Sequence, residues 1–144
     1  MKSTEILRKM SIDHAKLLRL LHLVQQIHGG DVIETIKVFD TFEWELEKHF
    51  FAEEKAIFTS YDPDNIIEGY KMVPTLIKDH TEILNTIRTL RRDILKRRPL
   101  DFNHLTESLI EHKKFEEEEV YPKLDQELTE EQKSKIIDRI TQIA

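Results

Sequence analysis

Two short stretches of this sequence place a glutamate four residues after a histidine. The first, HFFAEE, starts at His49, and the second, HKKFEE, starts at His112. Four residues make about one helical turn, so His49 would share a helix face with Glu53, and His112 with Glu116. Those faces are otherwise apolar, and a buried charge is costly unless it is paired or bound to a metal. The two stretches therefore point to metal ligation.

A second pair of histidines extends this pattern into an internal repeat. Asp13-His14 precedes AKLL and Asp79-His80 precedes TEIL at an offset of 66 residues, while the two His-x-x-x-Glu stretches are offset by 63. Each half supplies a lone histidine and a His-x-x-x-Glu pair, and such side chains suit iron, manganese or zinc. The alternative is a set of buried polar groups that satisfy one another without a metal. The candidate metal ligands are His14, His49, Glu53, His80, His112 and Glu116.

The elements that must position these residues are helices, because apolar residues recur at helical spacing along nearly the whole chain. Short loops between long helices favour antiparallel neighbours, so we predict an all-α fold: an up-down-up-down four-helix bundle with a short C-terminal helix. The whole chain, 1–144, is expected to form one domain, with the bundle over about 3–126 and the last helix over about 129–143. The first predicted helix runs from a cap at Ser3 to Gly29, and the second runs from a cap at Asp31 to about Ser60. The third covers about 66–98, with Pro74 at a break or a fresh first turn. The fourth runs from a cap at Asp101 to about Gln126, and the last begins at a cap at Thr129 and ends at about residue 143.

Composition narrows the class of protein further. The chain has 144 residues, 3 glycines, 4 prolines, no cysteine and a formal net charge of −6. The absence of cysteine excludes disulfides and thiolate metal sites, and the negative charge argues against a nucleic-acid partner. No apolar run has the length of a membrane span, and the N-terminal residues lack an apolar signal segment. We expect a cytoplasmic protein without a membrane partner.

The helix lengths bring the candidate ligands together. Counting residues up the first helix and down the second places His14 and His49 at nearly one level, and the second half repeats this arrangement less closely for His80 and His112. Two carboxylates among four histidines suit two ions, with each glutamate bridging them. Two octahedral ions with an oxide or hydroxide bridge would keep open positions for a small exogenous ligand. Glutamate three residues before a histidine, which ferritin-like sites use, does not occur here.

These motifs, DH at 13–14 and 79–80, HFFAEE and HKKFEEEEVYP, resemble the hemerythrin-like (HHE cation-binding) family over about residues 10–126. The resemblance implies a four-helix bundle with a non-haem di-iron centre. It further implies that the four histidines are terminal ligands and the two glutamates are bridging ligands. Two iron ions with an oxo or hydroxo bridge are therefore expected, with manganese or zinc as alternatives. The implied function is binding of O2, NO or a related small ligand.

One position departs from the oxygen-carrying members of that family, which have a fifth histidine where this chain has Leu76. Reversible oxygen storage is therefore less well supported than sensing or redox chemistry. The alternatives are an iron-handling or iron-sensing module, a peroxide- or NO-processing enzyme, and a zinc or structural bundle. The sequence assigns no catalytic residue, protein partner or oligomeric state. Glu45, one turn before His49, is a candidate substitute ligand.

Several nearby residues receive more ordinary interpretations. Asp13 and Asp79 would each serve a histidine of another helix if they faced inward, but a surface position is the favoured interpretation. In the run of four carboxylates at 116–119, only Glu116 is expected to face inward. Phe50, Phe51, Phe58 and Phe115 are interpreted as plain core, with a position bordering the site as the alternative for Phe115. The lining above the site is expected to be mostly aliphatic: Leu17, Leu18, Leu46, Ile83, Leu84 and Leu109, with Ser108.

Overall fold

The computed structural model describes residues 2–59 and 68–143, which are largely helical and contain no strand. This confirms the predicted all-α class. Three short irregular helices adjoin the regular ones: two π-helices, η1 (Glu53–Phe58) and η3 (Glu116–Val120), and the 3₁₀ helix η2 (Glu68–Met72). The α-helices are α1 (Glu5–Ile27), α2 (Val32–Ala52), α3 (Val73–Leu95), α4 (Asn103–Phe115), α5 (Tyr121–Glu127) and α6 (Glu130–Ile143).

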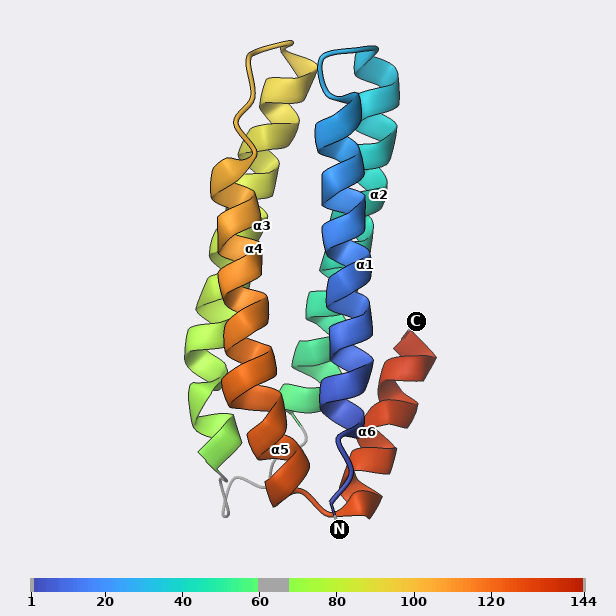
Figure 1. Cartoon of the computed structure of the whole chain (residues 1–144), viewed down its shortest axis with the longest axis vertical. Helices are drawn as coiled ribbons and strands as arrows, with labels where there is room; N and C mark the ends of the chain where they lie inside the picture. The colour runs from blue at the N-terminus through green and yellow to red at the C-terminus, as the bar shows by residue number, and fades with distance from the viewer. Residues whose placement is uncertain (1, 60–67, 144) are drawn as a thin grey trace.

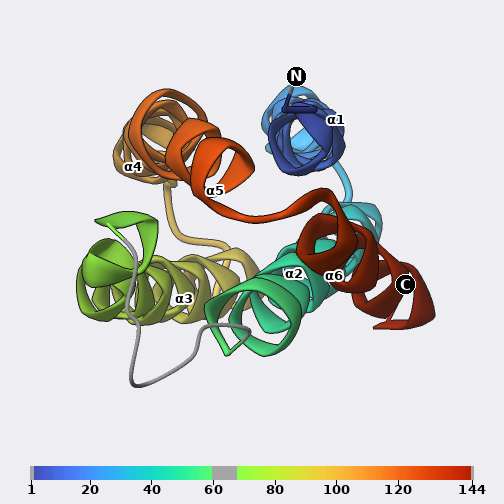
Figure 2. The same cartoon turned by 90° about the horizontal axis from the view of Figure 1, so that it is seen from below.

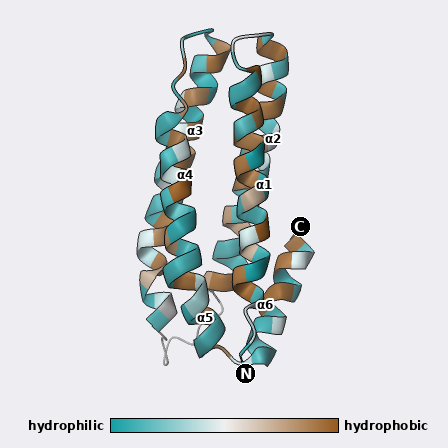
Figure 3. Cartoon of the chain, in the orientation of Figure 1, coloured by the Kyte–Doolittle hydropathy of each residue, from teal (hydrophilic) through white to brown (hydrophobic). Residues whose placement is uncertain are grey.

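Four helices run along the long axis of the molecule, and successive ones run in opposite directions (Figure 1). Helix α1 packs on α2, α2 on α3, α3 on α4, and α4 on α1. Seen from below, these helices surround the core, and α6 lies outside them beside α1 and α2 (Figure 2). Hydrophilic and hydrophobic stripes alternate around the helices (Figure 3), as expected when one face of each helix is buried. Among the described residues, no helix has both the length and the apolar character needed to cross a bilayer.

Local sequence signals account for the starts of α2, α3 and α6. Asp31 caps α2 by accepting a hydrogen bond from the backbone N–H of Ile33. The Thr129 hydroxyl accepts from the N–H of Gln132, whose side chain accepts from the N–H of Thr129, which is a reciprocal cap. Pro74 stands in the first turn of α3, as one of the two predicted alternatives requires. These ends agree with the predictions.

Other predicted boundaries shift or lie beyond the described residues. Asp101 accepts from the N–H of Asn103, but the residue at the N-cap position of α4 is Phe102. Helix α3 ends at Leu95 rather than at residue 98. Helical structure continues from α2 through η1 to Phe58, whereas the predicted turn YDPDN and the predicted start at 66 lie outside the described residues.

The predicted cap at Ser3 is wrong, because α1 is capped from the other end of the chain. Helix α1 begins at Glu5, and the Ser3 backbone N–H and hydroxyl donate instead to the Glu130 carboxylate. The carboxylate of Asp125 accepts from the backbone N–H groups of Ile6 and Leu7, both at 3.1 Å. A carboxylate there satisfies first-turn amides and suits the positive end of the helix dipole. This contact joins α5 to α1.

A fully buried lysine extends this junction to α6. The Nζ atom of Lys133 donates to the backbone oxygens of Ser3 at 3.0 Å and Asp125 at 2.9 Å. It also lies 2.8 Å from the Glu130 carboxylate and 4.0 Å from that of Asp125. A buried ammonium is tolerated only when paired and hydrogen-bonded, as it is here. Lys133 therefore links α6 to both the N-terminal segment and α5.

Replacing Lys133 with methionine is expected to lower the free energy of unfolding by about 3 kcal/mol, because it leaves two backbone oxygens and the Asp125 carboxylate without their buried partner. Urea unfolding would measure the change. Lys135→Met on the same helix is the matched control, since Lys135 is largely exposed and pairs with the exposed Glu131 at 3.5 Å. Equal stability of the two variants would contradict this role for Lys133.

The hydrophobic core is divided into two parts. The part near α5 and α6 includes Met10, Leu76 and Val120, and the other part includes Leu17, Ile83 and Leu109. Along α1, α3 and α4 the predicted ligand positions fall between these two parts. The fold therefore places a layer of ionisable side chains across an otherwise apolar core.

Candidate metal centre

All four long helical segments contribute buried side chains to this layer. His14 comes from α1, and His80 comes from α3. The next helical segment in each half supplies a histidine and a glutamate one turn apart, His49 with Glu53 and His112 with Glu116. In each pair the histidine lies near the end of the α-helix, and the glutamate is the first residue of the π-helix that follows. The six side chains are almost inaccessible, with both glutamates at 0% and the histidines between 2% and 6% exposed. The structure thus brings together His14, His49, Glu53, His80, His112 and Glu116.

The six residues form two groups that share both carboxylates. One group contains His14 and His49, the other contains His80 and His112, and each also contains Glu53 and Glu116. Within each group the potential ligand atoms lie within 4.8 Å of one another. Two such groups with common carboxylates have the donor arrangement of two metal positions bridged by two glutamates.

The short distances in the layer connect the two halves of the sequence. Glu53 Oε1 lies 2.8 Å from His80 Nε2, and Glu53 Oε2 lies 3.9 Å from His49 Nε2. Glu116 Oε1 lies 3.2 Å from His14 Nε2 and 3.0 Å from His112 Nε2. Each glutamate therefore faces one histidine of each group, as a bridging carboxylate would.

Many of these inward atoms make no hydrogen bond within the described parts of the chain. They include Nε2 of His49, His80 and His112, together with Oε1 of Glu53 and both carboxylate oxygens of Glu116. Buried polar atoms are normally satisfied, so this concentration requires a physical reason. Metal coordination supplies one, because neutral imidazole nitrogen and carboxylate oxygen are ligands for iron, manganese and zinc. The residues present fit metal binding.

Each histidine also faces a carboxylate with its outer ring nitrogen, Nδ1. Two of these carboxylates precede a histidine in sequence: Asp13 lies 3.8 Å from His49, and Asp79 lies 3.5 Å from His112. Both therefore face a histidine of the neighbouring helix, which was the less favoured interpretation of the two aspartates. A carboxylate at Nδ1 orients the ring and raises the basicity of the nitrogen that faces a metal.

The other two outer carboxylates are Glu54, 3.1 Å from His80 Nδ1, and Glu117, 3.0 Å from His14 Nδ1. The sequence interpretation missed both and assigned Glu117 to a solvated face. The signal was present, because a second glutamate follows the first in both halves, at Glu54 and Glu117. Both lie in the π-helices, whose wider turns interrupt regular α-helical register and are frequent at functional sites.

Aromatic rings pack against the histidines. The Phe50 ring stacks on His80 with the centroids 3.8 Å apart, so Phe50 borders the centre rather than being plain core. Phe58 stacks on His80, and Tyr121, 63 residues later in the repeat, stacks on His14, each with centroids 6.0 Å apart. The Tyr121 hydroxyl also donates a short hydrogen bond to Glu53. At this pair of repeat positions the two halves of the centre therefore differ by a phenol hydroxyl.

A comparison with protein families identifies this arrangement. Residues 5–124 match the hemerythrin HHE cation binding domain. The chain belongs to this family. No match was found among curated proteins or among solved structures. The hemerythrin HHE match covers every one of the six layer residues and their outer carboxylates.

Two positions bear on how this hemerythrin HHE domain differs from a five-histidine centre. Leu76 is fully buried and packs in the core part near α5 and α6. Glu45 pairs with Lys16 at 3.1 Å and Lys48 at 3.3 Å, and it is not among the residues grouped around either metal position. The Glu45 carboxylate is therefore engaged in ion pairs with two lysines, and its position does not support a role as a substitute metal ligand.

A small apolar cavity lies against the centre between α1, α2 and α4. Its volume is about 20 Å³, and Leu17, Leu46, Phe50 and Leu109 are among its lining residues, together with three of the histidines. Leu18 also lines it, so four of the predicted aliphatic residues are found there. Ile83 instead packs in the core, and Ser108 lines a different pocket. Phe51 is 51% exposed, so its interpretation as core was wrong.

Metal binding is expected to release protons below about pH 9. Burial works against the charged form of His112, but the Glu116 carboxylate, 3.0 Å from His112 Nε2, outweighs it and raises the pKa of His112 to about 9. A metal binds only the neutral ring, so at pH 7 to 8 it must displace this proton, and affinity should rise about tenfold per pH unit for each proton displaced. Titrating metal into the weakly buffered, metal-free chain with a pH indicator would measure the release. Binding without proton release at pH 7 would contradict the expectation.

Proposed function

We propose that this hemerythrin HHE domain holds a non-haem di-iron centre and binds a small diatomic ligand, O2 or NO, for sensing or redox chemistry. In this proposal the metal ligands are His14, His49, Glu53, His80, His112 and Glu116. The observation that carries it is the sharing of Glu53 and Glu116 by both groups of potential ligands. Shared carboxylates suit two neighbouring ions better than one isolated ion, and the mixed imidazole and carboxylate donors suit iron, with manganese or zinc as alternatives.

The surroundings support a small ligand rather than an organic substrate. The cavity beside the centre has about the volume of one or two water molecules and is lined largely by aliphatic and aromatic groups. A bound pair of iron ions would supply redox and ligand-binding chemistry. The protein's own part is to fix the histidine rings through Asp13, Asp79, Glu54 and Glu117, and to keep bulk water from the layer.

The architecture in this proposal is a single domain over residues 1–144. Its up-down-up-down four-helix bundle is formed by α1 to α4, and α6 closes one side at the end where α5 lies. We further propose a cytoplasmic location without a nucleic-acid or membrane partner. The net charge of −6 supports the exclusion of nucleic acid.

The test is a spectrum of the iron-loaded, reduced protein before and after addition of O2, and separately of NO, with metal content measured on the same sample. A reversible spectral change with two irons per chain is the expected result. Irreversible oxidation by O2 without NO binding would favour iron handling, and turnover of peroxide or NO would favour an enzyme. Iron that gives no spectral response to either gas would contradict the proposed ligand class.

A further inference from the structure

Two surface pockets flank the layer on opposite sides, and the internal repeat relates them. One lies between α1 and α2 and has a volume of about 180 Å³; the other lies between α3 and α4 and has a volume of about 400 Å³. Asp13 and His49 line the first, and the residues at the repeat offsets, Asp79 and His112, line the second. The pockets are therefore equivalent positions beside the two halves of the centre.

The charges of the equivalent positions are reversed. Lys16 of the first pocket corresponds to Glu82 of the second, and Lys48 corresponds to Glu111. The α1/α2 pocket has three lysines against two carboxylates. The α3/α4 pocket has three carboxylates, and its lining includes neither lysine nor arginine. We call the α3/α4 pocket the acidic pocket, defined by Asp79, Glu82 and Glu111.

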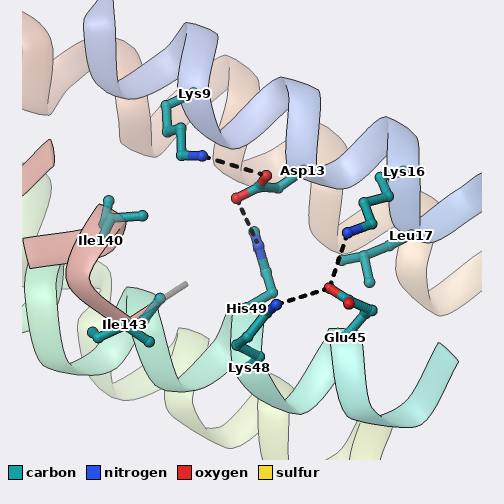
Figure 4. A pocket seen from close by; sticks show the side chains of 10 residues that line it. Lys9, Asp13, Lys16, Leu17, Glu45, Lys48, His49, Ile140 and Ile143 are labelled. Atoms are coloured by element: carbon teal, nitrogen blue, oxygen red, sulfur yellow. Dashed lines mark hydrogen bonds and ion pairs between the residues drawn. The ribbon is translucent and has the colours of Figure 1, made fainter. Parts of the chain in front are cut away.

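The α1/α2 pocket is internally neutralised and partly covered. Figure 4 shows Lys16 and Lys48 both directed at Glu45, and Lys9 directed at Asp13, 3.8 Å away. Ile140 and Ile143 of α6 close its other side. In the acidic pocket, Glu82 is 4.0 Å from an exposed lysine, and within the described residues Glu111 has no ion-pair partner. The acidic pocket therefore keeps a net negative charge that attracts cations from the solvent.

The acidic pocket also reaches a potential metal ligand. His112 lines it, is only 6% exposed, and has no hydrogen bond at either ring nitrogen within the described residues. Its Nδ1 lies 3.5 Å from Asp79, which is itself part of the pocket. The acidic pocket therefore has carboxylates at the surface and, deeper in, the His112 imidazole, which makes no hydrogen bond within the described residues. Hard divalent cations prefer carboxylate oxygen, and imidazole binds iron.

We propose that the acidic pocket is the entry site through which a divalent cation reaches the buried centre, an inference that rests on the proposed metal-binding function. Three carboxylates in a pocket lined by neither lysine nor arginine raise the local concentration of cations and steer their association, typically increasing on-rates by about ten to a thousandfold. The cation meets Glu82 and Glu111 first, and Asp79 beside His112 next. The α1/α2 pocket does not serve this role, because its three lysines outnumber its two carboxylates and pair with them.

The test gives the acidic pocket the residues of its counterpart. The double variant Glu82→Lys/Glu111→Lys changes only exposed side chains, and Asp79 and His112 are left intact. The control, Glu47→Lys/Asp138→Lys, makes the same charge change at exposed positions of α2 and α6 outside both pockets. Uptake of Co²⁺ by the metal-free chain is followed by stopped-flow absorption at low and high salt, and elemental analysis gives the final metal content.

The expected result is uptake at least about tenfold slower in the pocket variant than in the control, with the same final metal content and a weaker dependence on salt than in the natural chain. Equal rates in the two variants would overturn the entry site. A lower final metal content in the pocket variant would also overturn it, because the pocket would then contribute to binding itself. A natural chain that takes up no metal would refute the proposed function instead, so the two failures are distinguishable.

Discussion

Replacing Glu53 with alanine is expected to abolish metal binding at both proposed metal positions. Glu53 is fully buried and belongs to both groups of potential ligands. Its carboxylate lies near one histidine of each group, His49 and His80. Loss of a bridging carboxylate should weaken binding at both positions by more than about 100-fold, beyond the 10- to 100-fold typical of losing an outer partner. Elemental analysis after gel filtration would measure the loss.

Matched variants make this prediction specific. Glu116→Ala should also lose both ions, because Glu116 is the other shared residue, whereas His49→Ala should affect one position first, because His49 belongs to one group alone. Glu47→Ala, an exposed change on the same helix as His49, should keep full metal content. Retention of two ions by Glu53→Ala would show that Glu53 does not bridge them.

Removing metal with a chelator is expected to lower the melting temperature by roughly 8–16 °C. A ligand present at a thousand times its dissociation constant stabilises the folded state by about 4 kcal/mol, and each kcal/mol shifts the midpoint by about 2–4 °C in a chain of this size. The physical reason is the buried layer, whose Nε2 and carboxylate oxygens lack hydrogen bonds within the described residues. Without a metal these atoms destabilise the core.

Circular dichroism melts with and without chelator, followed by re-addition of Fe²⁺ under anaerobic conditions, would measure the shift and its reversal. Glu53→Ala provides the control, since a variant that binds no metal should melt at the same temperature with or without chelator. Identical melting curves for the loaded and chelated natural chain would mean that the layer is stable on its own, as a purely structural polar cluster would be.

The sequence predicted the helical layer well because its signals are local and repeated. His14 and Glu53 lie on faces whose apolar spacing is visible along the chain, and the repeat places their counterparts His80 and Glu116 in the same way. Spacing along a helix fixes which face a side chain shares, so the convergence of the six residues followed from helix length and alternating direction. The hydrogen-bonded caps at Asp31 and Thr129 were equally local signals.

Contacts between distant parts of the chain were not predictable from such signals. The capping of α1 by Asp125 and the burial of Lys133 depend on where α5 and α6 dock, which spacing within a helix does not reveal. Glu54 and Glu117 were missed for another reason. Regular α-helical geometry turns a residue away from its predecessor by about 100°, whereas both glutamates lie in π-helices that change this register.

The most direct test of the metal centre is elemental analysis of the protein purified from iron-supplied cells. We expect close to two irons per chain, falling to near zero in Glu53→Ala and unchanged in Glu47→Ala. A single zinc per chain, or no bound metal in the natural protein, would contradict it and leave the buried histidines and glutamates as a metal-free polar layer.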